Sequence, residues 1–161
     1  MSTARSASPG VRARSLSRTL ALVAGAAFLL VGIAGFFVTG FGDFAEHTDK
    51  TLLGFEVNPL HNVVHVVVGL AGLVMSSQVG TARTFGWLLF VGYGATFILR
   101  LIVADEPDRN FLSLNTADNV LHILSVLLGL VIALAPSRER DDVHLAAHPR
   151  RAGARTDGAG R

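Results

Sequence analysis

Two segments of the chain carry asparagine, histidine and aspartate at positions that share one face of a helix. Each has polar residues at i, i+3, i+4 and i+7, which fall within an arc of about 100° and extend about 10 Å along a helix. These residues are Asn58, His61, Asn62 and His65 in the first segment and Asn115, Asp118, Asn119 and His122 in the second. Imidazole and carboxylate groups bind zinc and iron. The candidate metal ligands are His61, His65, Asp118 and His122. A haem held between His65 and His122 is a further possibility.

Hydrogen bonding explains part of this pattern without any ligand. Asn58 precedes Pro59, as an N-cap does when proline occupies the first helical position. Asn115, with Asp118 three residues later, resembles a capping box. Interhelical hydrogen bonds, each worth on the order of 1 kcal/mol in a membrane, are expected for the four deeper residues, Asn62, His65, Asn119 and His122. The sequence therefore favours a buried structural network without a cofactor, with the metal or haem site as the alternative.

Other kinds of chemistry find less support in the sequence. Neither segment has the Glu-x-x-His pattern or the cysteines of many metal sites, and the neighbouring Asn and Asp are more polar than the lining of most cofactor pockets. The stretches Val66–Met75 and Ile123–Ala135 are almost entirely apolar, so no continuous polar path for transport is visible. Because Walker loops, dinucleotide fingerprints and nucleophile elbows are also absent, we favour a non-enzymatic protein.

Long uncharged runs indicate the elements that carry these residues. Only 16% of the 161 residues are charged, against about 25% in a typical soluble domain. Runs of 24, 26 and 19 uncharged residues follow Arg18, Glu56 and Asp118. Since roughly 20 apolar residues span a bilayer as a helix, we predict four membrane spans, at about 19–38, 59–76, 84–103 and 116–135. These runs, together with the absence of cysteine, exclude a soluble globular domain, a disulfide scaffold and a nucleic-acid-binding domain.

The charges outside the spans predict the orientation in the membrane. Residues 1–18 and 137–161 are expected to be disordered basic tails. The two tails and the loop after the second span hold eleven of the fourteen Lys and Arg residues. The positive-inside rule therefore places both termini in the cytoplasm of a bacterial plasma membrane. The lipid bilayer is the expected partner, the tails could attract anionic headgroups, and no oligomer or protein partner can be specified.

The polar segments form part of an internal repeat. Residues 58–74 and 115–131 match at eight of seventeen positions with an offset of 57, including two asparagines and one histidine. The first and third spans match more weakly at an offset of 60. We therefore predict an all-α four-helix bundle built from two helical hairpins related by a pseudo-two-fold axis along the membrane normal. Arg100 would lie at the depth of the polar residues and could snorkel outward or pair with Asp105, Glu106 or Asp118.

The same segments resemble a known family. LLGFEVNPLHNVVHVVVGLAGL (Leu52–Leu73) and NTADNVLHILSVLLGL (Asn115–Leu130) are similar to a bacterial membrane family catalogued as domain of unknown function 4383. The resemblance covers about Ser15 to Ala135. It implies a plasma-membrane protein with four spans and supports seven family-pattern positions, namely Asn58, His61, Asn62, His65, Asp118, Asn119 and His122.

Overall fold

The computed structural model describes residues 15–136, which form four α-helices joined by one short turn and two longer connections. The helices are α1 (Leu16–Thr39), α2 (Pro59–Met75), α3 (Val79–Ile102) and α4 (Thr116–Leu134). Three of them, α1, α3 and α4, are long and apolar enough to cross a membrane, and α2 is a shorter apolar helix of 17 residues. At 1.5 Å per residue α2 is about 25 Å long, near the lower limit for a membrane span. The predicted all-α membrane bundle is confirmed.

Two helices begin earlier than the charge pattern predicts. The third begins at Val79 rather than at about residue 84, and Thr81 Oγ1 in its first turn donates to the carbonyl of Met75 at the end of α2. The first begins at Leu16, so residues 16–18 are helical and not part of a disordered tail. Arg18 lies in this extension and its Nε donates to the carbonyl of Ser76 at 3.2 Å. The predictions for residues 1–14 and 137–161 lie outside the described residues.

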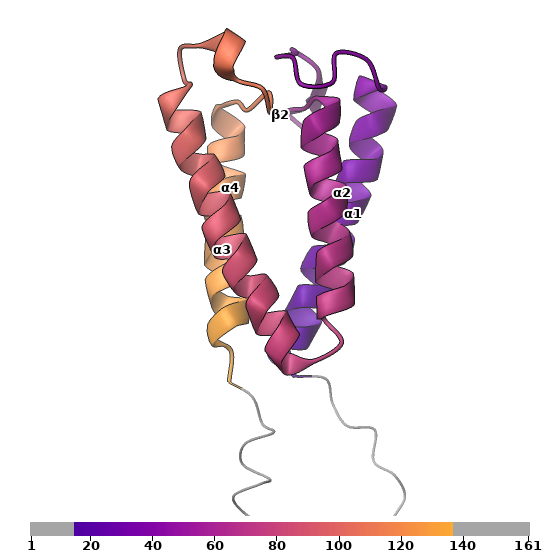
Figure 1. The fold of residues 1–161 in the computed structure, drawn as a ribbon, viewed down its shortest axis with the longest axis vertical. Helices are drawn as coiled ribbons and strands as arrows, with labels where there is room; N and C mark the ends of the chain where they lie inside the picture. Colours follow the sequence, from indigo (N-terminus) through magenta and orange to yellow (C-terminus); the bar gives the residue numbers. More distant parts are fainter. Residues whose placement is uncertain (1–14, 137–161) are drawn as a thin grey trace, which may run out of the picture.

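The bundle consists of two helical hairpins. As Figure 1 shows, α1 runs along α2 and α3 runs along α4, and the hairpins approach each other near the α2–α3 turn and diverge toward the opposite end. Glycines allow the close approach within each hairpin. A Cβ atom added to Gly72 would lie 2.7 Å from the Cα of Gly25, and one added to Gly129 would lie 2.7 Å from the carbonyl oxygen of Gly86.

The equivalent glycine contacts also test the alignment of the two hairpins. Gly72 and Gly129 are 57 residues apart, which agrees with the offset between the two polar segments. Their partners Gly25 and Gly86 are 61 residues apart, so the offset of 60 predicted for the first and third spans is one residue too short. The matches at offset 60 pair valine with valine, glycine with glycine and phenylalanine with phenylalanine. The alignment of the helices is instead determined by the glycines at which the two backbones touch. The common origin of the two hairpins stays a prediction.

The two longer connections, residues 40–58 and 103–115, meet at the end of the bundle that we call the loop end. The first contains the antiparallel strands β1 (Thr51–Leu52) and β2 (Phe55–Glu56), and the second contains the 3-10 helix η1 (Pro107–Arg109). The Asn58 side chain donates to the carbonyl of Phe111 at 2.7 Å, and the Ser113 hydroxyl accepts from the backbone N–H of Thr48 at 2.6 Å. These hydrogen bonds tie the two hairpins together where their helices diverge.

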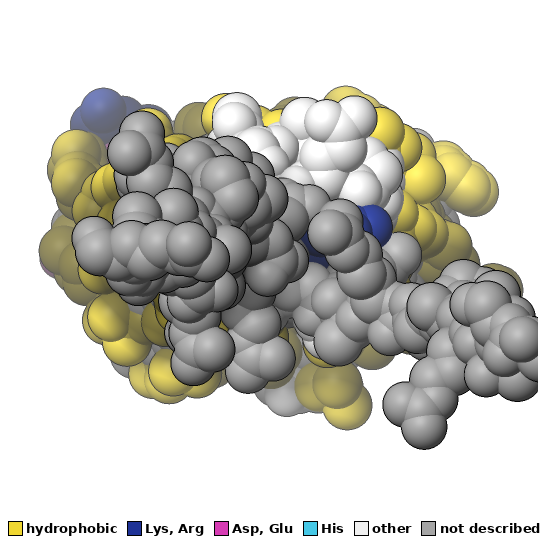
Figure 2. Space-filling view, turned by 90° about the horizontal axis from the view of Figure 1, so that it is seen from below, with side chains coloured by type: hydrophobic (Ala, Val, Ile, Leu, Met, Phe, Trp, Pro, Cys, Tyr) yellow, Lys and Arg dark blue, Asp and Glu magenta, His cyan; other side chains and the backbone are white. Residues whose placement is uncertain are grey.

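The distribution of side chains is that of a protein in lipid. Apolar side chains on all four helices are more than half exposed, among them Leu30, Val67, Leu88 and Leu127. Seen from the end opposite the loops, apolar side chains (yellow) lie around most of the edge of the molecule (Figure 2). By contrast, the side chains of Asn62, His65 and other polar residues of the helices are buried. Polar groups in a membrane are costly when they face lipid, so this inverted pattern is the expected one.

Candidate metal site at the loop end

Side-chain caps set the start of the two helices that carry the polar segments. Asn58 Oδ1 accepts from the backbone N–H of His61 at 2.8 Å at the start of α2. At the start of α4, Asn115 Oδ1 accepts from the N–H of Asp118 at 3.1 Å, and Asp118 Oδ2 accepts from the N–H of Asn115 at 2.7 Å. The predicted N-cap and capping box are therefore confirmed. They place His61 and Asp118 at the third position of their helices, directly beneath the loop end.

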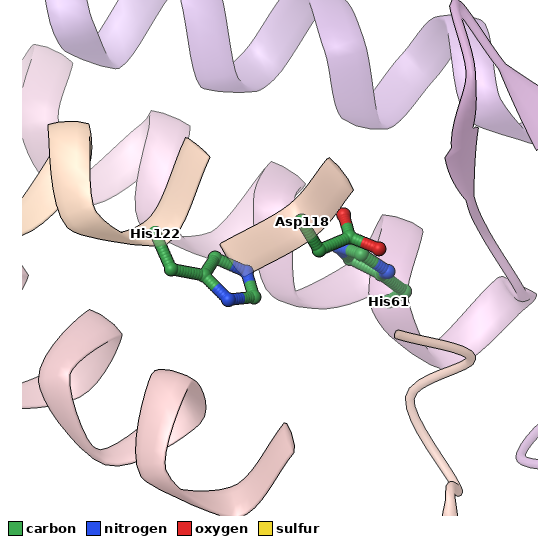
Figure 3. A group of neighbouring side chains, drawn as sticks. All are labelled: His61, Asp118 and His122. Carbon is green, nitrogen blue, oxygen red and sulfur yellow. The ribbon is translucent and has the colours of Figure 1, made fainter. Parts of the chain in front are cut away.

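Three of the predicted side chains converge between the hairpins. His61, Asp118 and His122 each offer one ligand atom, and these three atoms lie within 4.8 Å of one another. All three residues are buried, with relative exposures of 4%, 1% and 1%. Figure 3 shows that His61 comes from α2 and the other two from successive turns of α4. His61 is 57 positions from Asp118 and 61 positions from His122 in the chain, so the cluster bridges the two hairpins.

The hydrogen bonds of the three side chains leave at least one possible ligand atom of each residue free. The His61 ring donates from Nδ1 to the carbonyl of Leu112 at 3.0 Å, which leaves Nε2 with its lone pair in the neutral ring. Asp118 uses Oδ2 in the capping box, and its buried Oδ1 has no hydrogen-bond partner. His122 Nδ1 is also buried without a partner. An unpaired buried polar atom typically costs 1–3 kcal/mol, so this site is incomplete as a hydrogen-bonded cluster.

A cavity of about 270 Å³ lies beside the cluster, mainly between α2 and α3. His61, His65 and His122 line it together with Tyr93, and most of its remaining lining is apolar. His65 Nδ1 and the Tyr93 hydroxyl are buried and have no hydrogen-bond partner. The rings pack in series, because Tyr93 lies 5.5 Å from His122 and 5.2 Å from Phe28 between ring centroids. The two histidines of the haem hypothesis, His65 and His122, thus face one cavity.

The remaining predicted residues lie outside this cluster. Asn62 donates from Nδ2 to Thr39 Oγ1 at 2.9 Å, which joins α2 to α1, and Asn119 Oδ1 is buried without a partner. Within residues 15–136, no hydrogen bond connects any two of Asn62, His65, Asn119 and His122. The hydrogen bonds expected between asparagine and histidine are therefore not the ones formed. The reason is that α1 packs closely along α2, so Asn62 meets Thr39 of α1 rather than a residue of the second polar segment on α4.

Arg100 makes none of the ion pairs considered for it among the described residues. Its Nε is buried and unpaired, and Glu106 instead binds Arg109 at 2.8 Å. Arg100 lines a second pocket of about 260 Å³, whose polar lining includes Glu56 and Asn115. Leu114 lines both pockets, so they are neighbours near the loop end.

Sequence reasoning missed two contributors to the site. Tyr93 is the single tyrosine of the chain and lies inside a membrane span, and that rarity is the signal by which it could have been noticed. The carbonyl of Leu112, which orients His61, carries no sequence signal because any residue offers a backbone carbonyl.

The model of the family described as "Domain of unknown function (DUF4383)" matches residues 18–135. The chain belongs to this family. The matched region includes α2, α3 and α4, all of α1 except its first two residues, and every residue of the cluster. No match was found among curated proteins or among solved structures. The DUF4383 membership thus agrees with the resemblance seen in the sequence, and the site must be interpreted from its own chemistry.

Proposed function

We propose that this membrane protein binds a divalent transition metal, zinc or iron, through His61, Asp118 and His122. The observation that carries the proposal is the convergence of three buried ligand atoms within 4.8 Å. A tetrahedral zinc centre with bond lengths near 2.1 Å holds its ligand atoms about 3.4 Å apart. Small rotations of the three side chains would close the cluster around an ion.

The types of ligand favour zinc or iron over other cations. Two imidazoles and one carboxylate match the three protein ligands of catalytic zinc sites and the facial triad of non-haem iron. Calcium and magnesium prefer oxygen ligands, which are in the minority here. The Leu112 carbonyl supports the proposal because metal-bound histidines usually donate their second ring nitrogen to such a group.

A purely structural role explains the cluster less well. Asn58 and Asn115 use both the oxygen and the nitrogen of their side chains in hydrogen bonds, so they can stabilise the bundle without a ligand. Asp118 Oδ1 is buried and unpaired, and a bound cation would complete its coordination. His65 was also a candidate ligand, but it is not among the three residues whose ligand atoms converge.

The orientation that we propose places the loop end outside the cell and both termini in the cytoplasm of the plasma membrane. The support is the charge distribution, since the tails and the α2–α3 turn region hold eleven Lys and Arg residues. The metal site would then lie in the outer half of the bilayer. The apolar stretch of α4 below His122 would separate it from the cytoplasm.

The test is metal analysis of the full chain purified in detergent, incubated with zinc or ferrous iron and desalted. We expect about one equivalent of one metal in the wild type and less than a tenth of that in His122→Ala. His65→Ala is the matched control, because it removes a buried histidine of the same cavity that lies outside the cluster, and it should keep its metal. A wild-type protein that retains neither metal contradicts the proposal and favours the structural network.

A further inference from the structure

We infer that the cavity beside the cluster binds the hydrocarbon chain of a single-chain carboxylate amphiphile, such as a fatty acid, with its carboxylate at the metal. The inference names a substrate class for the proposed centre, and therefore rests on the proposed function for its polar end. His61 and His122 belong to both the cluster and the cavity wall, so an ion held there would face the cavity.

The cavity is polar at one end and apolar along the rest of its length. Its wall on α2 extends from His61 to Ala71, ten residues or about 15 Å. The polar side chains of the wall are all toward the loop end, namely His61, His65, Tyr93, Thr96 and His122. Farther along, the wall consists of residues such as Val68, Phe85 and Leu89. This division matches a molecule with one polar end and an extended apolar chain.

The cavity opens toward the hydrocarbon of the bilayer. Val64, Val67 and Leu88 line it and are 39%, 58% and 56% exposed, so the opening lies between α2 and α3 on the apolar surface of the bundle. Apolar cavities of about 150 Å³ stay dry and bind small hydrocarbons. At about 270 Å³, this cavity would take up an acyl chain in preference to water.

The polar end favours an anionic headgroup. The Tyr93 hydroxyl and His65 Nδ1 are buried without partners on residues that are only 6% and 3% exposed. The hydroxyl can donate to a carboxylate oxygen. A divalent ion bound by one aspartate and two neutral histidines keeps a net charge of +1. In a medium of low dielectric constant, a carboxylate ligand would neutralise that charge.

Gly92 offers a way to fill the cavity without disturbing the helices. It lines the cavity, and a Cβ atom added there would meet nothing within 4 Å. Gly80 has equally open surroundings on the same helix but is not part of the cavity wall. Gly92→Leu and Gly80→Leu therefore form a matched pair.

The experiment uses palmitic acid with a diazirine in the middle of its chain, added to zinc-loaded full-length protein in nanodiscs and crosslinked by light. We expect adducts on cavity-lining peptides of α2 and α3, reduced at least about tenfold by Gly92→Leu and unchanged by Gly80→Leu. Excess palmitic acid should compete for labelling better than methyl palmitate, which lacks the free carboxylate.

Each part of the inference can fail separately. Absent labelling, or labelling that Gly92→Leu leaves unchanged, overturns the acyl-chain assignment. Equal competition by palmitic acid and methyl palmitate overturns the carboxylate assignment. Metal content is measured on the same samples and on a parallel sample loaded with ferrous iron. A loaded but unlabelled protein refutes only this inference, whereas a protein that retains neither zinc nor iron refutes the proposed centre itself.

Discussion

The replacement Asp118→Asn separates the two roles of one carboxyl group. Asp118 Oδ2 closes the capping box by accepting from the backbone N–H of Asn115, while Oδ1 is buried without a partner and is the oxygen that we propose as the metal ligand. An asparagine side chain can keep the first interaction through its amide oxygen but places an NH₂ group where the ligand oxygen was. The variant should therefore retain its helix cap and lose its metal.

The expected magnitudes follow from these contacts. Loss of a group that hydrogen-bonds to a metal ligand typically lowers metal affinity 10–100-fold. Loss of a ligand itself should therefore weaken zinc binding by more than about 100-fold. The matched control is Asn115→Ala, which removes the side-chain bond to the N–H of Asp118 but keeps the backbone N–H that orients its carboxylate. Loss of this cap should lower the free energy of unfolding by about 1 kcal/mol and leave zinc binding within a few-fold.

The assays are zinc titration against a competing chelator and thermal unfolding of the metal-free protein in detergent. Asp118→Asn should lower zinc affinity more than stability, and Asn115→Ala should do the opposite. The reasoning is refuted if Asp118→Asn binds zinc as the wild type does. It is equally refuted if Asn115→Ala weakens zinc binding as much as Asp118→Asn, because the carboxylate would then act only through the helix cap.

Three further predictions concern packing, metal linkage and topology. Gly129→Ala should strongly lower the thermal stability in detergent because its Cβ would lie 2.7 Å from the carbonyl oxygen of Gly86, whereas Gly80→Ala, with open surroundings, should change it little or raise it. Free zinc at 100 times its dissociation constant should stabilise the wild type by about 2.7 kcal/mol, and a melting temperature that does not change with zinc would argue against a site in the folded state. A reporter active only outside the cytoplasm should be inactive when fused after Arg161 and active when inserted after Asp108, and the reverse result would invert the proposed orientation.

Much of the local structure was accessible from the sequence because it depends on neighbouring residues. The spacing of Asn115 and Asp118 predicted the capping box, and the uncharged runs predicted the helices to within a few residues. The start of α3 is predicted least accurately, because the charge of Arg83 suggests a position outside the span. The helix continues through it, and the Arg83 guanidinium donates to the carbonyl of Ala135 at the end of α4.

Helical periodicity alone determined that eight polar residues lie on two faces, because side-chain direction within a helix depends only on sequence spacing. Which of these residues meet depends on how the two hairpins pack. The glycine contacts and the hydrogen bonds across the loop end set that arrangement, and they join positions far apart in the chain. The tertiary structure therefore decided that Asn62 binds Thr39, that Arg100 lines a separate pocket, and that His61, Asp118 and His122 converge.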